Sequence, residues 1–417
     1  MIKIGFSKRD ITAPLGTELG GYAGYRPCTG VHDPLFCKVV VLEQEDVRYA
    51  LVVLDLLCVD EPLYHRIAQE VAVLGISRER LLVCAIHSHA SPVGVIPGEG
   101  VLAAINTGDI RDPGFMQYSR MVIQAAGDAC REAVEELEIF QVRTARGAAP
   151  VIGTERHTGN IPETWLTALQ FQTESGKNLI LYSFPCHPTV LSAANLQVSA
   201  DFVGGVEALL DTDMAVFVNG AAGDISTRFT RREATFDECA RMAKIAAAGI
   251  RDLLQDAVYT APTPLKGMHE TLTLNVRQVE SPEQAALQLE EATLRWQQAA
   301  DRGEDAARLR ILKSYVEGAG VNLDFSRALG SIRQLALPVT VFRFAGLTFA
   351  TVPGELFSSL QPEGVLIFSY ANGYFRYIAG KDAYDAGYYE ALAAILARGE
   401  GERLIAGITD MICRLEK

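Results

Sequence analysis

The sequence predicts an α/β fold in which mixed β-sheets are flanked by helices. Short apolar runs of strand length recur along the chain, and segments of helical periodicity separate several of them. The clearest case is an apolar strand at 49–55, followed by a helix near 61–75 and a second apolar strand at 81–87. Such β-α-β units favour parallel pairing, with functional side chains at the carboxyl ends of the strands.

Length and composition indicate a globular protein with one large core. The chain has 417 residues, of which 49% are hydrophobic and 21% charged. Without an internal repeat or a low-complexity linker, we expect one domain over residues 1–417. The formal net charge of −13 is spread along the chain. This argues against nucleic acid or an anionic membrane as a partner. The sequence leaves open whether the protein forms a homo-oligomer.

The N-terminus does not resemble a signal peptide, because Lys3, Lys8, Arg9 and Asp10 interrupt its apolar residues. No apolar stretch reaches the roughly 20 residues that a transmembrane helix needs. The eight cysteines are scattered, with no Cys-x-x-Cys, so we expect reduced core residues rather than disulfides. These features predict a cytoplasmic protein without a transmembrane segment.

The other elements follow in chain order. Strands are expected at 38–42, 141–146, 167–172, 179–185, 215–218, 338–344, 347–352 and 365–370, and helices at 115–136 and 235–255. The Gly-bearing stretch 93–109 is expected to be a loop that helps to wall a pocket. A helical hairpin is predicted at 281–317, because SPEQ at 281–284 is a capping box with proline at the first helical position and Gly303 breaks the pattern.

Candidate functional residues lie where apolar runs end. His87 and His89 follow one run, His187 follows another, and Glu355 follows a third. Alternate side chains of a strand point the same way, so the paired imidazoles are expected to converge. Each residue alone is compatible with a core histidine, a helix cap or a surface carboxylate. Together, two histidines and a carboxylate are a zinc ligand set that leaves room for water.

Six motifs resemble, in order, those of the neutral (non-lysosomal) ceramidases, zinc amidohydrolases that cleave the N-acyl bond of ceramide. They are GFSKRDITAP with GGYAGY, AIHSHASP, FPCHPTVLS, NGAAGDIS, VPGEL, and NGYFRY with AYDAGYYE. The resemblance covers the family's catalytic domain nearly end to end, and it implies that domain's fold. We expect the family's secretion signal or membrane anchor and its C-terminal immunoglobulin-like domain to be missing from this short form.

The resemblance also implies a metal site. Its ligands would be His87, His187, Glu355 and Tyr377, holding one Zn²⁺ per chain. Tyrosine is an unusual zinc ligand, because its reference pKa of about 10 must fall on coordination.

Catalytic roles are implied for four further residues. His89 would sit beside the metal-bound water or the scissile bond, and Ser226 would be the nucleophile or an essential second group. Tyr389 would donate a hydrogen bond to the substrate carbonyl, and Arg156 matches an active-site arginine. Thr227 departs from the family, which has proline after the serine.

These implications predict a zinc amidohydrolase that cleaves an N-acyl bond of a small or lipid-like substrate by metal-activated water, with help from serine, histidine and tyrosine. The acyl and amine groups stay open. One alternative is a zinc-dependent esterase or lactonase using the same site. Another is a catalytically inactive, metal-binding homologue.

Overall fold

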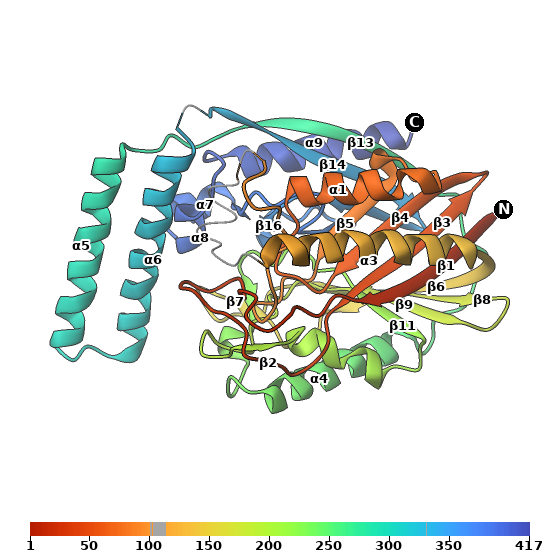
Figure 1. The fold of residues 1–417 in the computed structure, drawn as a ribbon, viewed down its shortest axis with the longest axis horizontal. Coiled ribbons are helices and arrows are strands. Elements are labelled where there is room, and N and C mark those ends of the chain that lie inside the picture. The colour runs from red at the N-terminus through yellow and green to blue at the C-terminus, as the bar shows by residue number, and fades with distance from the viewer. Residues whose placement is uncertain (101, 103–113, 331) are drawn as a thin grey trace.

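The computed structural model describes residues 1–100, 102, 114–330 and 332–417. It confirms the expected mixed α/β fold, with a large mixed sheet flanked by helices (Figure 1). Part of the loop expected at 93–109, namely residues 101 and 103–109, lies outside the described residues.

The larger sheet has eight strands and is mixed. Across the sheet their order is β11 (Met214–Phe217), β9 (Asn178–Ser183), β8 (Trp165–Thr173), β6 (Glu138–Ala148), β1 (Ile2–Asp10), β3 (Phe36–Gln44), β4 (Val47–Leu54) and β5 (Leu81–Ala85). Neighbours are antiparallel except at the two edges, where β11 pairs with β9 and β4 with β5 in parallel. The β4–β5 edge is the predicted β-α-β unit, with α1 (Glu61–Val71) as its crossover helix.

A second sheet packs against the first. Its order is β13 (Lys266–Asn275), β14 (Gln334–Phe344), β15 (Leu347–Thr351) and β17 (Val365–Phe368). Only β15 and β17 are parallel. Phe344 of β14 lies with its ring centroid 6.4 Å from Phe140 of β6 and 6.3 Å from Phe171 of β8. These aromatic contacts join the two sheets face to face.

Helices cover the outer faces of both sheets. They are α3 (Phe115–Glu135), α4 (Phe236–Leu254) and α9 (Glu400–Leu415). A Cβ at Gly5 of β1 would meet the Ala133 carbonyl of α3, and a Cβ at Gly147 of β6 would meet Leu253 of α4. The β1–β6 register puts both glycines on the same face, so α3 and α4 share that face. Helix α9 packs on β13 and β14, which gives a helix–sheet–sheet–helix order of layers.

The predicted helical hairpin is present and longer than expected. Helix α5 (Pro282–Asp301) begins with the capping box of Ser281, and α6 (Ala306–Ala328) continues well past residue 317. The expected end was wrong because tertiary packing overrides the low helix propensity of glycine after that position. Figure 1 shows the pair projecting from one side of the body, with α5 outermost.

Several short strands and helices lie outside these two sheets. They are β2 (Gly30–Val31), β7 (Thr154–Glu155), β10 (Gln197–Val198), β12 (Ile225–Ser226), β16 (Glu355–Leu356), β18 (Tyr377–Ile378), α7 (Lys381–Asp385) and α8 (Tyr389–Leu392). Strand β16 pairs in parallel with β18, and β12 pairs with β7 in antiparallel fashion. These two pairings bring segments that are far apart in the chain side by side.

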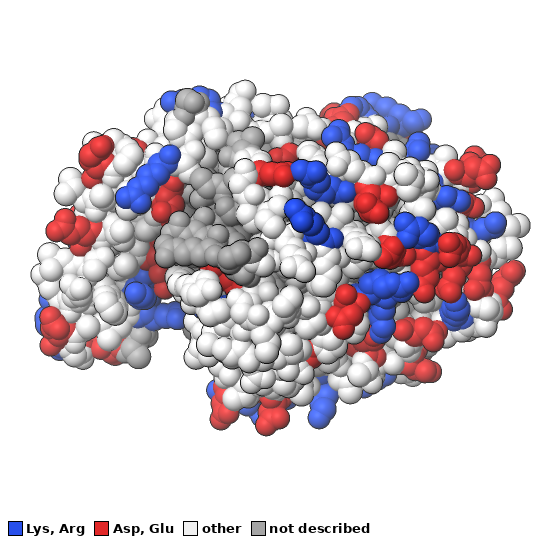
Figure 2. All heavy atoms as spheres, viewed as in Figure 1, with Lys and Arg blue, Asp and Glu red and all other residues white. Residues whose placement is uncertain are grey.

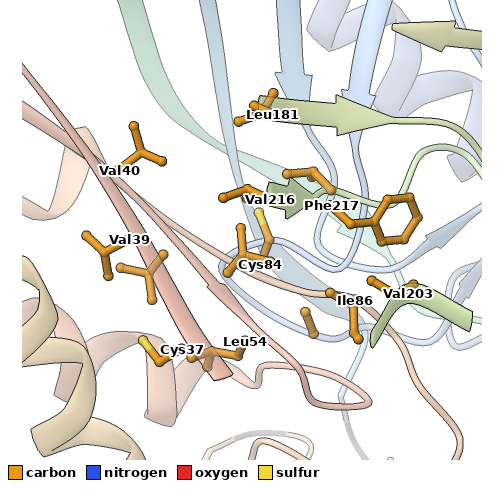
Figure 3. Packing of buried hydrophobic residues seen from close by; sticks show 14 of the residues in the cluster. Cys37, Val39, Val40, Leu54, Cys84, Ile86, Leu181, Val203, Val216 and Phe217 are labelled. Atoms are coloured by element: carbon orange, nitrogen blue, oxygen red, sulfur yellow. The ribbon is translucent and has the colours of Figure 1, made fainter. Parts of the chain in front are cut away.

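The core holds cysteines among apolar side chains, and the surface carries charges of both signs. Cys37 and Cys84 lie among apolar side chains such as Leu54 and Val216 (Figure 3). All eight cysteines lie in the described residues and are free thiols, as expected; only Cys413 is exposed. Charges of both signs are scattered over the face in Figure 2. Among the described residues, no helix has the length and apolarity needed to cross a bilayer.

Candidate metal and catalytic site

The paired histidines meet, although not as neighbours on one strand. Strand β5 ends at Ala85, and His87 has a left-handed backbone with φ of 71°. The expectation that the strand reaches residue 87 was wrong, because the backbone leaves the sheet there and Asn219 donates to the Ile86 carbonyl at 3.2 Å. The two rings nevertheless converge, with Nε2 of His87 3.3 Å from Nε2 of His89.

Backbone carbonyls set the orientation of two of the imidazoles. Nδ1 of His87 lies 2.7 Å from the Leu57 carbonyl. Nδ1 of His187 lies 2.6 Å from the Ala222 carbonyl and 3.1 Å from that of Ile225. A carbonyl can only accept, so Nδ1 is the protonated nitrogen in both rings. In the neutral form of either ring Nε2 would carry a lone pair, as a metal ligand needs.

The neutral state of His187 follows from its surroundings. Its side chain is fully buried. Burial, together with the positive charge of Arg156, lowers the pKa of His187 to about 3. The ring is therefore neutral at physiological pH, and its Nε2 is free to bind a cation.

Glu355 completes the convergence. Its Oε2 lies 2.9 Å from Nε2 of His187 and 3.3 Å from Nε2 of His87, and its Oε1 accepts a hydrogen bond from the Tyr374 hydroxyl at 2.5 Å. A single proton can bridge only one pair among these lone-pair atoms. A divalent cation would accept all of them at once, so the donor set fits a metal such as zinc.

His89 lies next to His87, His187 and Glu355. The ring nitrogens of His87, His89 and His187 lie within 4.8 Å of one another, so the three could also hold a metal ion together. Nδ1 of His89 is buried, and no described residue gives it a hydrogen-bond partner. Burial and the neighbouring imidazoles lower the pKa of His89 well below its ordinary value. His89 is thus a neutral imidazole beside the atoms that could hold a metal ion.

Loop residues near the N-terminus press on His89. Its ring makes an edge contact with Tyr22, at a centroid distance of 4.8 Å. Gly21 has φ of +87°, and a Cβ there would lie 2.4 Å from Nδ1 of His89. Arg26 donates to the His89 carbonyl at 3.3 Å. Only glycine at position 21 leaves the imidazole its space.

Arg156 borders the same group of residues. Its Nη1 donates to the Tyr377 hydroxyl oxygen at 3.1 Å, to Oε1 of Glu390 at 3.3 Å and to the Gly223 carbonyl at 3.3 Å. Burial alone would lower the pKa of Arg156, but Tyr377, Glu390 and Glu355 outweigh burial and raise it above its ordinary value. Arg156 therefore stays cationic. Burial raises the pKa of Tyr377 well above its ordinary value, so its phenol is neutral without a bound cation.

Ser226 and Tyr389 lie next to these residues. Ser226 is buried in β12, and its backbone forms a parallel bridge with that of His187. Tyr389 is half-buried at the start of α8, with its ring edge-on to Tyr377 at a centroid distance of 6.1 Å. Burial raises the pKa of Tyr389 to about 12, so its hydroxyl is protonated and can donate. All eight predicted site residues thus belong to one contiguous cluster.

Five further residues in the cluster were not predicted as site residues. Oε2 of Glu390 lies 3.1 Å from Nε2 of His157, and that ring stacks on Tyr388 at 3.6 Å. Tyr370 stacks on His87 at 4.2 Å, and Tyr374 binds the glutamate carboxylate. Their only signal in the sequence was nearness to predicted site residues. Three of them are direct neighbours of predicted residues, and Tyr374 and Tyr370 lie three and seven positions before Tyr377.

The chain is similar to known proteins in sequence and in fold. Residues 2–234 match the family model described as neutral/alkaline non-lysosomal ceramidase, N-terminal. The crystal structure of neutral ceramidase from Pseudomonas aeruginosa is similar to the whole chain, with a TM-score of 0.76, 16% identity and coverage of 74% of that chain. A ceramidase complexed with C2 is also similar over the whole chain, with a TM-score of 0.73, 16% identity and coverage of 75% of that chain. No curated protein matches this sequence.

Proposed function

The chain belongs to the neutral/alkaline non-lysosomal ceramidase family, and from this premise we propose that it is a zinc-dependent amidohydrolase that cleaves the N-acyl bond of a lipid-like substrate. The observation that carries the proposal is the convergence of His87, His187 and Glu355 on one point, at 2.9 and 3.3 Å from the glutamate oxygen. Nitrogen and oxygen ligands of this kind favour zinc among the common divalent ions.

Tyr377 is the proposed fourth ligand. The pairing of β16 with β18 puts Tyr377 directly opposite Glu355 in register, which supports its approach to the same ion. Arg156 donates to the phenol oxygen, so it would steady that oxygen and favour its anionic form. When bound, zinc would lower the pKa of a coordinated water to about 7 and polarise the substrate carbonyl.

The protein's own side chains would then handle the proton and the charge. His89 is a neutral imidazole with a free nitrogen, so it can take a proton and pass it to the leaving amine. The protonated hydroxyl of Tyr389 can donate to the carbonyl oxygen as negative charge develops there. Ser226 lies beside His187, in reach of the same region, as a nucleophile or as a group that orients the attacking water.

Both halves of the chain would build this site. His87 and His187 follow strands of the eight-stranded sheet, whereas Glu355 and Tyr377 come from segments beside the four-stranded sheet. This supports the proposal that residues 1–417 act as one catalytic domain. The solved relative complexed with C2 supports a lipid-like ligand, and the acyl chain and amine are left to experiment.

A substrate panel tests the proposed activity. The purified zinc form would be assayed against N-acyl amides of increasing acyl length and against esters of the same acyl groups. We expect turnover of amides, lost on chelation and restored by zinc. Turnover of esters alone would favour the esterase or lactonase alternative, and turnover of neither class in a zinc-loaded protein would favour the inactive homologue.

A further inference from the structure

Helix α6 changes character along its length. Up to residue 317 its described side chains are exposed or half-buried, and its neighbour is α5. From Gly318 onward one face is buried, through Asn322, Phe325 and Leu329. The spacing of these positions is that of one side of a helix. The second half of α6 is therefore part of the body, while the first half belongs to the projecting arm in Figure 1.

Gly318 lies in the contact between α6 and α8. A Cβ at this position would lie 3.0 Å from Cδ1 and 3.3 Å from Cβ of Leu392, and 3.7 Å from Cδ2 of Tyr389. Glycine is disfavoured inside helices, and at this position the close packing against α8 offsets that cost by leaving no room for a side chain. A Cβ at Gly320, two residues later in the same helix, would meet no described residue within 4 Å. Of these two glycines, only Gly318 lies close to α8.

Helix α8 is held from its other side by the candidate site. Glu390, the residue after Tyr389, binds Arg156 at 3.3 Å and His157 at 3.1 Å. Val321, on the next turn of α6, packs against the same apolar cluster as Tyr389. A side chain added at position 318 would therefore displace α8. This helix is packed against α6 and is also bound to Arg156 and His157 through Glu390.

We propose that Gly318 is a positioning residue for amide cleavage, and that the α5–α6 pair sets the position of the Tyr389 hydroxyl through it. This inference rests on the proposed function. Displacement of a catalytic donor by about 1 Å can cost on the order of 100-fold in rate. The backbone contact at position 318 would keep α8 close to the ring of Tyr377, so that the Tyr389 hydroxyl could donate to the substrate carbonyl.

Two matched substitutions test the proposal. Gly318→Val and Gly320→Val add the same side chain to the same helix, and only the first meets α8. For an N-acyl amide, we expect Gly318→Val to lower kcat at least about tenfold, with zinc content unchanged and a smaller effect on KM. Gly320→Val should stay within about twofold of the wild type. Gly318→Ala, whose single Cβ requires the smaller shift, gives the same test if the valine variant does not fold.

The Tyr389→Phe background separates positioning from general damage. If Gly318 acts through the tyrosine hydroxyl, Gly318→Val should cost little further rate once that hydroxyl is gone. An equal loss of kcat in both backgrounds, or equal effects of the valines at 318 and 320, would overturn the inference.

Hydrogen exchange gives a readout that does not depend on activity. The amides of Leu392 and Ala393 bond to the carbonyls of Tyr388 and Tyr389 at 3.1 and 2.9 Å. We expect Gly318→Val, and not Gly320→Val, to speed their exchange, and unchanged exchange would overturn the contact. A wild-type protein that cleaves no N-acyl amide would refute the proposed function, and the exchange would still decide whether position 318 controls α8.

Discussion

The carboxylate oxygen Oε2 of Glu355 lies 2.9 Å from Nε2 of His187, although 168 residues separate them in the chain. His187 follows a strand of the eight-stranded sheet, and Glu355 follows a strand of the four-stranded sheet. The packing of the two sheets thus brings together lone pairs that a bound cation would satisfy. The predictions below test this site and the residues that support it.

Glu390→Gln tests the support of Arg156. The substitution keeps the shape of the side chain and removes the charge that pairs with the buried guanidinium. Loss of the charge from a buried pair costs about 3 kcal/mol of unfolding free energy. We expect kcat/KM for an N-acyl amide to fall at least about tenfold, with zinc content unchanged.

A matched control for this change is Glu238→Gln. Glu238 binds Arg241 within α4, outside the candidate site, with an Oε1 to Nη2 distance of 2.6 Å. The control should change thermal stability and leave kcat/KM near the wild-type value. Equal losses of activity in the two variants would contradict a role for Glu390 in the site.

Gly21→Ala tests the placement of His89. A methyl group at this position would enter the space of the imidazole, 2.4 Å from Nδ1. Gly24 has a similar φ of +93° and nothing within 4 Å of an added Cβ, so Gly24→Ala introduces the same backbone strain without the clash. We expect activity to fall at least about tenfold in Gly21→Ala only. Similar activities in the two variants would show that His89 needs no fixed position.

Ser226→Ala distinguishes two catalytic roles. Complete loss of turnover with zinc retained would indicate a direct part for the hydroxyl, whereas a mild effect would leave metal-activated water as the sole nucleophile. We expect zinc to be retained, because Ser226 meets His187 through the backbone, which the substitution leaves in place. Metal analysis and single-turnover assays check both statements, and loss of zinc would contradict the placement.

The contribution of Asp201 to the stability of the protein should fall as the pH rises from about 4 to about 6. Burial raises the pKa of Asp201 from 3.8 to about 6, against three backbone hydrogen bonds that lower it. In this window the folded state binds more protons than the unfolded state, so a rise in pH costs stability. At about 1.4 kcal/mol per pH unit, the Asp201 contribution amounts to about 3 kcal/mol.

Denaturant unfolding of Asp201→Asn measures that contribution. The unfolding free energy of the wild type, measured relative to that of Asp201→Asn, should fall by about 3 kcal/mol between pH 4 and pH 7. Asp213→Asn is the control, because Asp213 is an exposed carboxylate that accepts from the Asn178 amide. A pH dependence in Asp201→Asn equal to that of the wild type would contradict the assignment.

Local patterns in the sequence were sufficient for much of the fold. The capping box at Ser281 and the unit β4–α1–β5 depend on neighbouring residues, and both are confirmed. The end of α6 was predicted too early, because the burial of Gly318 against α8 involves residues more than 70 positions away. Long-range packing of this kind has no periodic signal.

The candidate site shows the same limit. The motifs around His187 and Glu355 were visible, because each follows an apolar run next to proline or small residues. The ion pair between Arg156 and Glu390 was not, since it spans 234 positions and neither residue ends a predicted strand. His87 was found for a reason that proved wrong, since its left-handed backbone, and not strand alternation, turns the ring toward His89.

The most direct test of the central claim is the zinc content of the purified protein, measured by elemental analysis in the wild type and in His187→Ala and Glu355→Gln. His269→Ala is the control, because that histidine lies outside the site and bonds to Thr340. We predict about one zinc per chain in the wild type and the control, and loss of both zinc and amide hydrolysis in the two site variants. A wild-type protein that hydrolyses amides without bound metal, or a His187→Ala variant that keeps its zinc and its activity, would contradict the account.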